Sequence, residues 1–177
     1  MARITAVFFA VACVLAAAAG ASIYPGKSQA LMPTLQEIGF TQLVTFQPTK
    51  KPAAALAKGY KNGVVALYQK GTQKVPIQSV ATVYVYTSTA NARLAWDHAC
   101  VKCKTQTAPA GLRLKAQAGT SAGMPVIHEV TVCANVYLDV VVQGKESALK
   151  LDTDAAKITN AVLTRATHTG LSSCSAK

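Results

Sequence analysis

Acidic residues and long apolar runs are scarce in this chain, and each scarcity narrows the functions to consider. The 177 residues include 18 Lys and Arg but only 7 Asp and Glu, which gives a net charge of +11. So few carboxyl groups leave few ways to place the two acids that carboxylate catalysis requires. After the first 21 residues, no apolar run approaches the roughly 20 residues of a membrane-spanning helix. We therefore expect no transmembrane span in the mature protein.

The amino-terminal apolar run has the form of a secretory signal. Arg3 supplies a short basic start, residues 4–19 are apolar, and Ala19-Gly20-Ala21 is a small-residue cleavage site. We predict a signal peptide over residues 1–21, and hence a secreted or extracytoplasmic protein.

The remaining chain suits one domain. Residues 22–34 contain Pro and Gly without periodicity and are predicted to form an extended arm, followed by a single domain over residues 35–177. An uncleaved signal anchor is one alternative to secretion. Lipidation at Cys13 is another, disfavoured because Ala10 stands where a lipoprotein signal has a larger aliphatic residue.

Cysteine usage is consistent with an oxidising compartment. Signal cleavage removes Cys13 and leaves an even set, Cys100, Cys103, Cys133 and Cys174. An even number in a secreted domain predicts two disulfides, and the sequence does not choose among the three pairings. A structural zinc site usually has two close ligand pairs, whereas only one is present here. We expect no metal and no cofactor.

The motif Cys100-Val101-Lys102-Cys103 resembles the active sequence of thiol–disulfide enzymes. The pair follows a predicted helix, however, and the carboxyl end of a helix does not stabilise a thiolate. A structural disulfide is therefore the favoured interpretation.

The positive charge suggests anionic partners. A cationic secreted protein is attracted to phospholipid headgroups or acidic polymers, although a solvated lysine surface explains the charge equally well. The lysines are scattered except for Lys50-Lys51, and aromatic residues do not alternate with them as in single-strand binders. We expect a monomer with a small or anionic ligand, an anionic cell-surface polymer as a further partner, and no sequence-specific nucleic acid.

Strand patterns dominate the domain. Alternating or β-branched segments predict strands at residues 42–47, 64–68, 77–86, 112–118, 124–133 and 136–142. Asn62-Gly63 and Ala134-Asn135 are predicted to be turns. Helices are expected over residues 53–58, from a Ser88 cap to Cys100, and from Asp152 to His168. The order predicts an α+β fold, with an antiparallel sheet covered on one side by two main helices and pinned by disulfides.

Residues with catalytic chemistry occur without a recognised motif. A hydrolase triad could be assembled from Ser88, His98 and Asp97, or from a pairing of His128 with Asp139. The Gly-x-Ser-x-Gly elbow of such enzymes is absent from the sequence. His128 is expected at the surface or an edge. Asp139 interrupts an apolar strand and is expected to form a salt bridge with Arg113 or Lys115. If Asp139 acted instead in carboxylate catalysis, the only nearby candidate for the second acid would be Glu129. No catalytic residue is assigned.

The segment 132–142, followed by Ala155-Ala156-Lys157-Ile158 and a helix to Arg165, resembles the extracellular sensor domains of mycobacterial receptor-type serine/threonine kinases and related secreted proteins. The resemblance implies an antiparallel α+β domain, pinned by disulfides, with a cleft for a ligand. No site residue is carried over from it.

The leading hypothesis is a secreted, non-catalytic, ligand-binding or sensor-like domain. The alternatives are a secreted enzyme, hydrolytic or thiol-dependent, and a cationic protein that binds anionic polymers or membrane surfaces.

Overall fold

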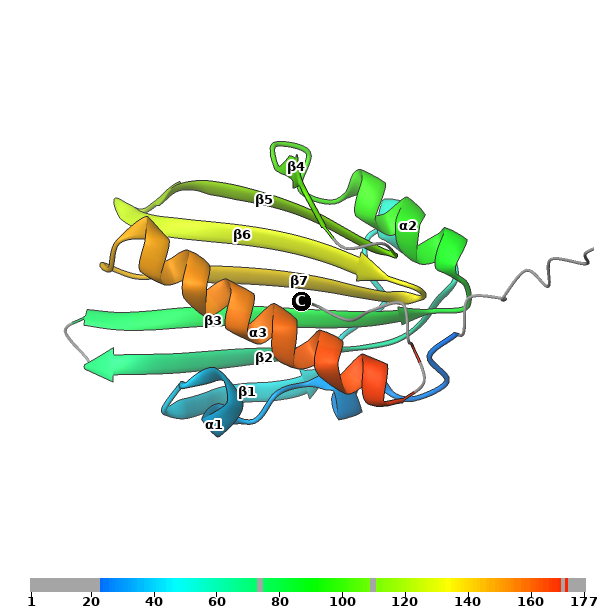
Figure 1. The fold of residues 1–177 in the computed structure, drawn as a ribbon, viewed down its shortest axis with the longest axis horizontal. Helices are drawn as coiled ribbons and strands as arrows, with labels where there is room; N and C mark the ends of the chain where they lie inside the picture. The colour runs from blue at the N-terminus through cyan, green and yellow to red at the C-terminus, as the bar shows by residue number, and fades with distance from the viewer. Residues whose placement is uncertain (1–22, 73–74, 109–110, 170, 172–177) are drawn as a thin grey trace, which may run out of the picture.

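The computed structural model describes residues 23–72, 75–108, 111–169 and 171. Its centre is a seven-stranded antiparallel sheet in the order β1-β2-β3-β7-β6-β5-β4 (Figure 1). The strands are β1 (Gln42–Pro48), β2 (Tyr60–Thr72), β3 (Val75–Tyr86), β4 (Lys104–Gln106), β5 (Leu112–Ser121), β6 (Met124–Cys133) and β7 (Val136–Gln143). The helical segments are η1 (Ser28–Leu31), α1 (Leu35–Ile38), η2 (Ala54–Leu56), α2 (Thr89–His98) and α3 (Ala148–His168). The predicted α+β class and antiparallel sheet are confirmed.

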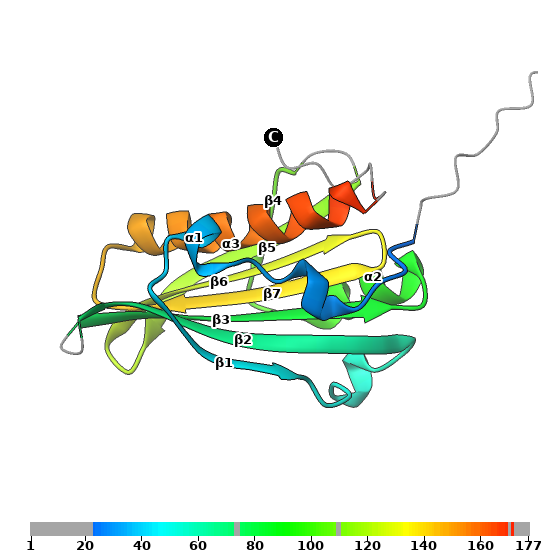
Figure 2. The same cartoon turned by 90° about the horizontal axis from the view of Figure 1, so that it is seen from below.

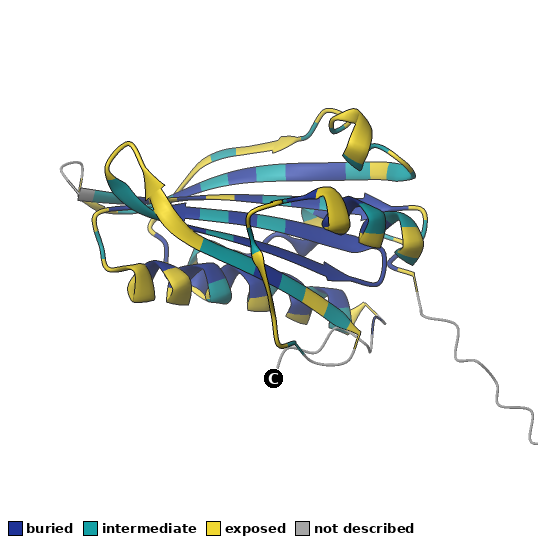
Figure 3. Ribbon diagram, turned by 90° about the horizontal axis from the view of Figure 1, so that it is seen from above, coloured by how far each residue is buried: buried dark blue, intermediate teal, exposed yellow. Residues whose placement is uncertain are grey.

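The long helix α3 covers one face of the sheet, which we call the α3 face (Figure 2). Leu138 and Val140 on β7 belong to the same buried cluster as Ile158 and Val162 on α3. Successive side chains of a strand point to opposite faces, so the intervening residues of β7 face away from α3. Figure 3 shows the buried residues concentrated on the central strands and on the side of α3 that meets them.

The other face, which we call the α2 face, carries a second and smaller cluster. Trp96 and Ala95 of α2 pack with Val130 and Tyr137, and the Trp96 indole N–H donates to the Val130 carbonyl at 3.1 Å. The expectation that the sheet is covered on one side only is therefore wrong. The helix is held there because its buried stripe includes a large aromatic residue that finds a backbone acceptor.

Several predicted ends and turns also differ from the structure. Asn62 and Gly63 are not a turn but lie within β2, opposite Val85 and Tyr84 of β3. A Cβ atom at Gly63 would collide with the Tyr84 ring, so this glycine permits close packing rather than chain reversal. The helix expected over residues 53–58 is only the short turn η2, and the short strand β4 was not predicted.

The ends of the two main helices follow from capping. As predicted, the Ser88 hydroxyl accepts a hydrogen bond from the backbone N–H of Asn91 at the start of α2. Helix α3 begins earlier than predicted, because the Ser147 hydroxyl accepts from the Lys150 N–H. Asp154 is therefore an interior helical residue. It is buried and pairs with Lys70 on β2, with 2.6 Å between Oδ1 and Nζ.

The arm preceding α1 is part of the packed structure. Leu31, Met32 and Tyr24 are buried. The buried Asn135 side chain accepts from the Tyr24 N–H at 2.7 Å and donates to the Tyr24 carbonyl at 3.0 Å. It also donates to the Tyr86 carbonyl at 2.8 Å. Asn135 was expected to stabilise its own turn, but it instead joins the arm to the sheet.

Within the described residues, no helix combines the length and apolarity needed to cross a membrane.

Candidate ligand-binding site

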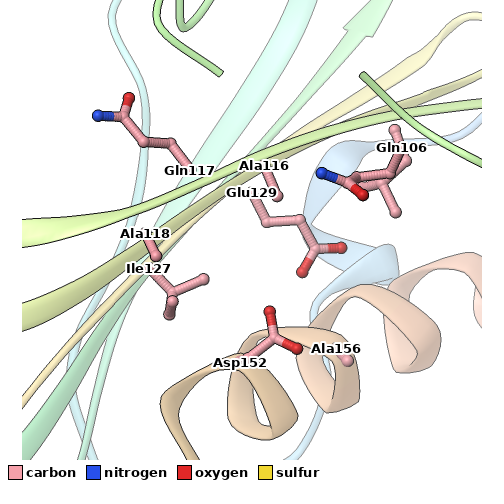
Figure 4. Close-up of a pocket in the computed structure, with 9 residues that line it drawn as sticks. Gln106, Ala116, Gln117, Ala118, Ile127, Glu129, Asp152 and Ala156 are labelled. Atoms are coloured by element: carbon pink, nitrogen blue, oxygen red, sulfur yellow. The ribbon is translucent and has the colours of Figure 1, made fainter. Parts of the chain in front are cut away.

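Two adjoining cavities lie on the α3 face, between α3 and strands β5 and β6. Their volumes are about 400 Å³ and about 260 Å³. They share Leu114, Glu129 and Ala156 in their walls. Together they fall in the size range of small-molecule sites, which is roughly 300 to 1,000 Å³. Figure 4 shows the larger cavity, with Glu129 pointing into it from the sheet and Asp152 pointing in from α3.

The space arises where small side chains face one another. Ala116 and Ala118 of β5 line one wall, and Ala156 of α3 lines the other. Where larger residues meet, their side chains fill the space between a helix and a sheet to native packing density. Alanine side chains are too short to do so, and a gap remains. The remaining apolar wall comes from Leu112, Leu114, Ile127 and Leu163. The alternation in β5 thus places its apolar residues in the cavity.

Glu129 is the buried acid of this site. It is only 7% exposed and lines both cavities. Burial raises the pKa of Glu129, the neighbouring Thr159 hydroxyl partly opposes that rise, and the negative charge of Asp152 adds to it. A carboxyl group in such surroundings gains from a partner that donates hydrogen bonds or carries positive charge.

Two buried hydroxyl groups lie beside Glu129. Thr131 and Thr159 are 1% and 4% exposed, and both line the smaller cavity. Within the described parts of the chain, neither hydroxyl oxygen makes a hydrogen bond of ordinary geometry. Buried hydroxyl groups are usually paired, so this wall offers unused hydrogen-bonding capacity toward the cavity.

The α2 face carries a different polar group. His128 Nε2 and Asp139 Oδ1 are 3.0 Å apart, and the Tyr137 hydroxyl donates to Asp139 Oδ2 at 3.1 Å. Asp139 raises the pKa of His128 by accepting a hydrogen bond from its ring, and burial partly opposes this rise. His128 and Asp139 are about two-thirds buried, with side chains 30% and 29% exposed. His128 is therefore a paired sheet residue rather than an edge residue.

The expected salt link from Asp139 to Arg113 or Lys115 is wrong. Lys115 lies opposite Val130, and Val130 lies opposite Asp139, so all of strand β6 separates the two charges. The Lys115 ammonium lies instead 4.5 Å from the centroid of the Trp96 ring. The Arg113 Nη1 atom lies 3.9 Å from Asp97 Oδ1. Sequence alternation gave the correct face for these residues, but not the strand order that determines their neighbours.

The cysteine pair lies close to His128. Cys100 and Cys103 form a disulfide, which confirms a disulfide in the CxxC motif. The two sulfurs and a His128 ring nitrogen lie within 4.8 Å of one another. Metal binding requires thiolates, so the disulfide form is not a metal site. Cys133 is buried and disulfide-bonded. Cys174 lies outside the described residues, so the prediction of two disulfides among the four cysteines stays a prediction.

A surface hollow of about 510 Å³ lies beside β1 and contains the close pair Lys50 and Lys51. Both lysines are exposed. Because these two lysines are solvated, ion pairs between them and an anionic partner would contribute little binding free energy. This hollow lacks the buried polar groups of the cavities beneath α3.

Sequence reasoning noted Glu129 only as an acid near Asp139 and missed the two threonines. Glu129 and Asp139 in fact face opposite sides of the sheet, since Glu129 lies opposite Val140 and Asp139 opposite Val130. The available signal was a Glu and a Thr at alternate positions of an otherwise apolar strand, both on the face that a helix covers. Thr159 gave no signal because its helical neighbours do not reveal a cavity.

No family model matches the chain, and no curated protein matches it. Among solved structures, the chain is similar to the extracellular domain of PknH from Mycobacterium tuberculosis, with a TM-score of 0.40 and 17% identity. The match covers 77% of this chain and 94% of that chain. The resemblance to this group of extracellular domains is thus confirmed as a weak one, and neither a ligand nor a site residue is transferred from it.

Proposed function

We propose that this chain is an extracytoplasmic, non-catalytic domain that binds a small molecule in the cavities beneath α3. The observation that carries the proposal is a pair of adjoining cavities whose walls combine alanine, leucine and isoleucine with polar side chains, among them a buried carboxyl group. Apolar walls with a few placed polar groups are typical of small-molecule sites. The size of the two cavities, about 400 and about 260 Å³, suits one ligand of modest length.

Two features support a place outside the cytoplasm. The first 21 residues have the composition of a secretory signal. The Cys100–Cys103 disulfide is of a kind that persists in oxidising compartments and is rare in the cytosol.

The division of polar groups between the two faces favours binding over hydrolysis. Glu129 faces α3, while its chain neighbour His128 faces the opposite side and is paired with Asp139. A histidine must be within hydrogen-bond reach of the reacting group to act as its base. The sheet itself separates His128 and Asp139 from any molecule bound beside Glu129.

A fluorescent binding assay tests the proposal. Nile red, which is neutral and apolar, should bind the mature protein in a 1:1 complex with a blue-shifted emission. Leu114→Trp should reduce that affinity by about tenfold or more, because the indole would occupy the space shared by the cavities. Ala156→Leu, which fills the same space from α3, should act in the same direction.

Val80→Trp is the matched control, since Val80 is 39% exposed and lines neither cavity. It should bind Nile red like the parent. The proposal is wrong if Nile red does not bind the parent protein. It is also wrong if folded Leu114→Trp and Ala156→Leu variants bind as tightly as Val80→Trp.

A further inference from the structure

The polar groups of the cavity beneath α3 are buried and incompletely paired. Glu129, Thr131 and Thr159 are 7%, 1% and 4% exposed, so each is more than nine-tenths buried. As far as the structure describes the chain, the Thr131 hydroxyl oxygen has no hydrogen-bond partner, and the Thr159 hydroxyl, although it lies beside Glu129, makes no hydrogen bond of ordinary geometry. Burying a polar group without a partner costs free energy. A ligand that forms hydrogen bonds with these oxygens would therefore be favoured, because the free protein does not make those bonds.

The charge of the cavity is opposite to that of the protein. The chain has 18 Lys and Arg and only 7 Asp and Glu. Yet Glu129 and Asp152 both line the larger cavity, and the described lining residues of the two cavities include no Lys, Arg or His. Figure 4 shows the two carboxyl groups directed toward each other across the space. A ligand carboxylate or phosphate placed here would meet like charge in surroundings that screen it poorly.

We infer that the ligand is an amphipathic amine, whose ammonium group is held by Glu129 and whose apolar chain lies against the leucines of the smaller cavity. This inference rests on the proposed function and names its ligand class. A primary ammonium has three N–H donors and no acceptor. The Glu129 carboxylate and the Thr131 and Thr159 hydroxyl oxygens provide acceptors of the matching kind. Leu112, Leu114 and Leu163 provide the apolar wall.

Three ligands with one chain and different head groups provide the test. Octylamine, octanol and octanoate are titrated into the mature protein at neutral pH, with displacement of Nile red and calorimetry as readouts. Octylamine should bind about tenfold or more tightly than octanol, since its ammonium adds a positive charge to the hydrogen bond that either head group can donate to the Glu129 carboxylate. Octanoate should bind more weakly than octanol.

Variants assign the preference to individual residues. Glu129→Gln keeps the shape and removes the charge, so it should abolish the preference for octylamine over octanol. Thr131→Val and Thr159→Val should each weaken octylamine binding several-fold. The thermal stability of Thr131→Val should not fall, because this variant removes a buried hydroxyl that has no hydrogen-bond partner among the described residues.

Glu146→Gln is the matched control, because Glu146 pairs with Lys150 and does not line the cavities. It should retain the full preference. Asp152→Asn changes an exposed residue and should lower the preference in part, which keeps the test valid if Glu129→Gln does not fold.

The outcomes separate this inference from the proposed function. If octylamine and octanol bind equally, or octanoate binds most tightly, the amine assignment is overturned. A loss of Nile red affinity in Leu114→Trp would still support a ligand cavity. The assignment is also overturned if none of the three displaces bound Nile red. Failure of Nile red itself to bind removes the proposed function and the inference together.

Discussion

His128 and Asp139 lie on neighbouring strands and pair across the α2 face, with 3.0 Å between Nε2 and Oδ1. Tyr137 donates to the second carboxylate oxygen of Asp139, and its ring stacks on Tyr84 at a centroid distance of 5.7 Å. The acid that interrupts the most apolar strand is therefore satisfied by its own sheet neighbours. This pairing makes the stability of the fold depend on pH.

We predict that the stabilisation from His128 is lost as pH rises. The pKa of His128 is raised in the folded protein, chiefly because its ring donates to Asp139, whereas an unfolded histidine titrates near pH 6.5. The contribution is therefore complete below about pH 6.5 and falls as pH passes through the folded pKa. Urea unfolding at about pH 5.5 and about pH 8.5 measures it. His128→Gln should remove this part of the pH dependence.

We predict that Asp139→Asn lowers the pKa of His128 toward its ordinary value. The pair is partly exposed, so the loss of stability should be small, about 0.2 to 1 kcal/mol. Titration of the His128 ring proton by NMR provides the measurement, and the two other histidines serve as internal references. An unchanged titration curve in Asp139→Asn would refute the pairing.

We predict that Asn135→Ala destabilises the domain strongly. Its side chain makes hydrogen bonds to the Tyr24 N–H, the Tyr24 carbonyl and the Tyr86 carbonyl. Loss of these partners should cost about 2 to 4 kcal/mol, because the backbone groups remain buried. Denaturant unfolding measures the change. Asn91→Ala, which removes an exposed bond to Thr87, is the control, and equal effects of the two variants would contradict the prediction.

We predict that Lys70→Met costs about 3 to 5 kcal/mol, since it leaves the Asp154 carboxylate buried without its cation. Asp154 is 2% exposed and is 2.6 Å from the Lys70 ammonium. Adding Asp154→Leu should recover most of that loss, because the double variant has no unpaired buried charge at this position. A single variant as stable as the parent would show that Asp154 is satisfied in another way.

We predict that Ile158→Asp destabilises by roughly 3 to 5 kcal/mol, because it puts a charge into the core beneath α3. Ile158 is fully buried. Lys157→Asp places the same residue at an exposed position of the same helix and should change the midpoint of thermal unfolding only slightly. Similar midpoints for both variants would mean that the buried stripe of α3 is assigned wrongly.

We predict that the mature protein contains no titratable thiol under denaturing conditions. Cys100 and Cys103 are bonded to each other, which leaves Cys133 and Cys174 to form the second of the two predicted disulfides. Reaction with a thiol reagent, followed by mass spectrometry of non-reduced peptides, counts the thiols and identifies the bridges. Two or more free thiols would contradict the two-disulfide prediction.

The sequence by itself determined the elements whose causes are local. The alternation of Val126 to Val132 and the β-branched run after Asn135 predicted strands, and both formed. The Ser88 cap and the apolar stripe around Ile158 predicted the two main helices. Each of these signals depends on the spacing of side chains within a few residues, and this spacing does not depend on the tertiary structure. Asn62-Gly63 misled because a turn preference is weak against sheet packing, where Gly63 makes room for Tyr84.

Only the tertiary structure decided which residues meet. The strand order places β6 between Lys115 and Asp139, so Asp139 pairs with His128 on β6 rather than with Lys115 on β5. The position of α3 over β5 and β6 brought Thr159 to Glu129 and placed Ala156 opposite other alanines, which created the cavities. Asn135 bonds with Tyr24 across 111 residues of sequence. Such pairings depend on the strand order and register of distant segments and on how a helix crosses them, and no local periodicity in the sequence specifies these.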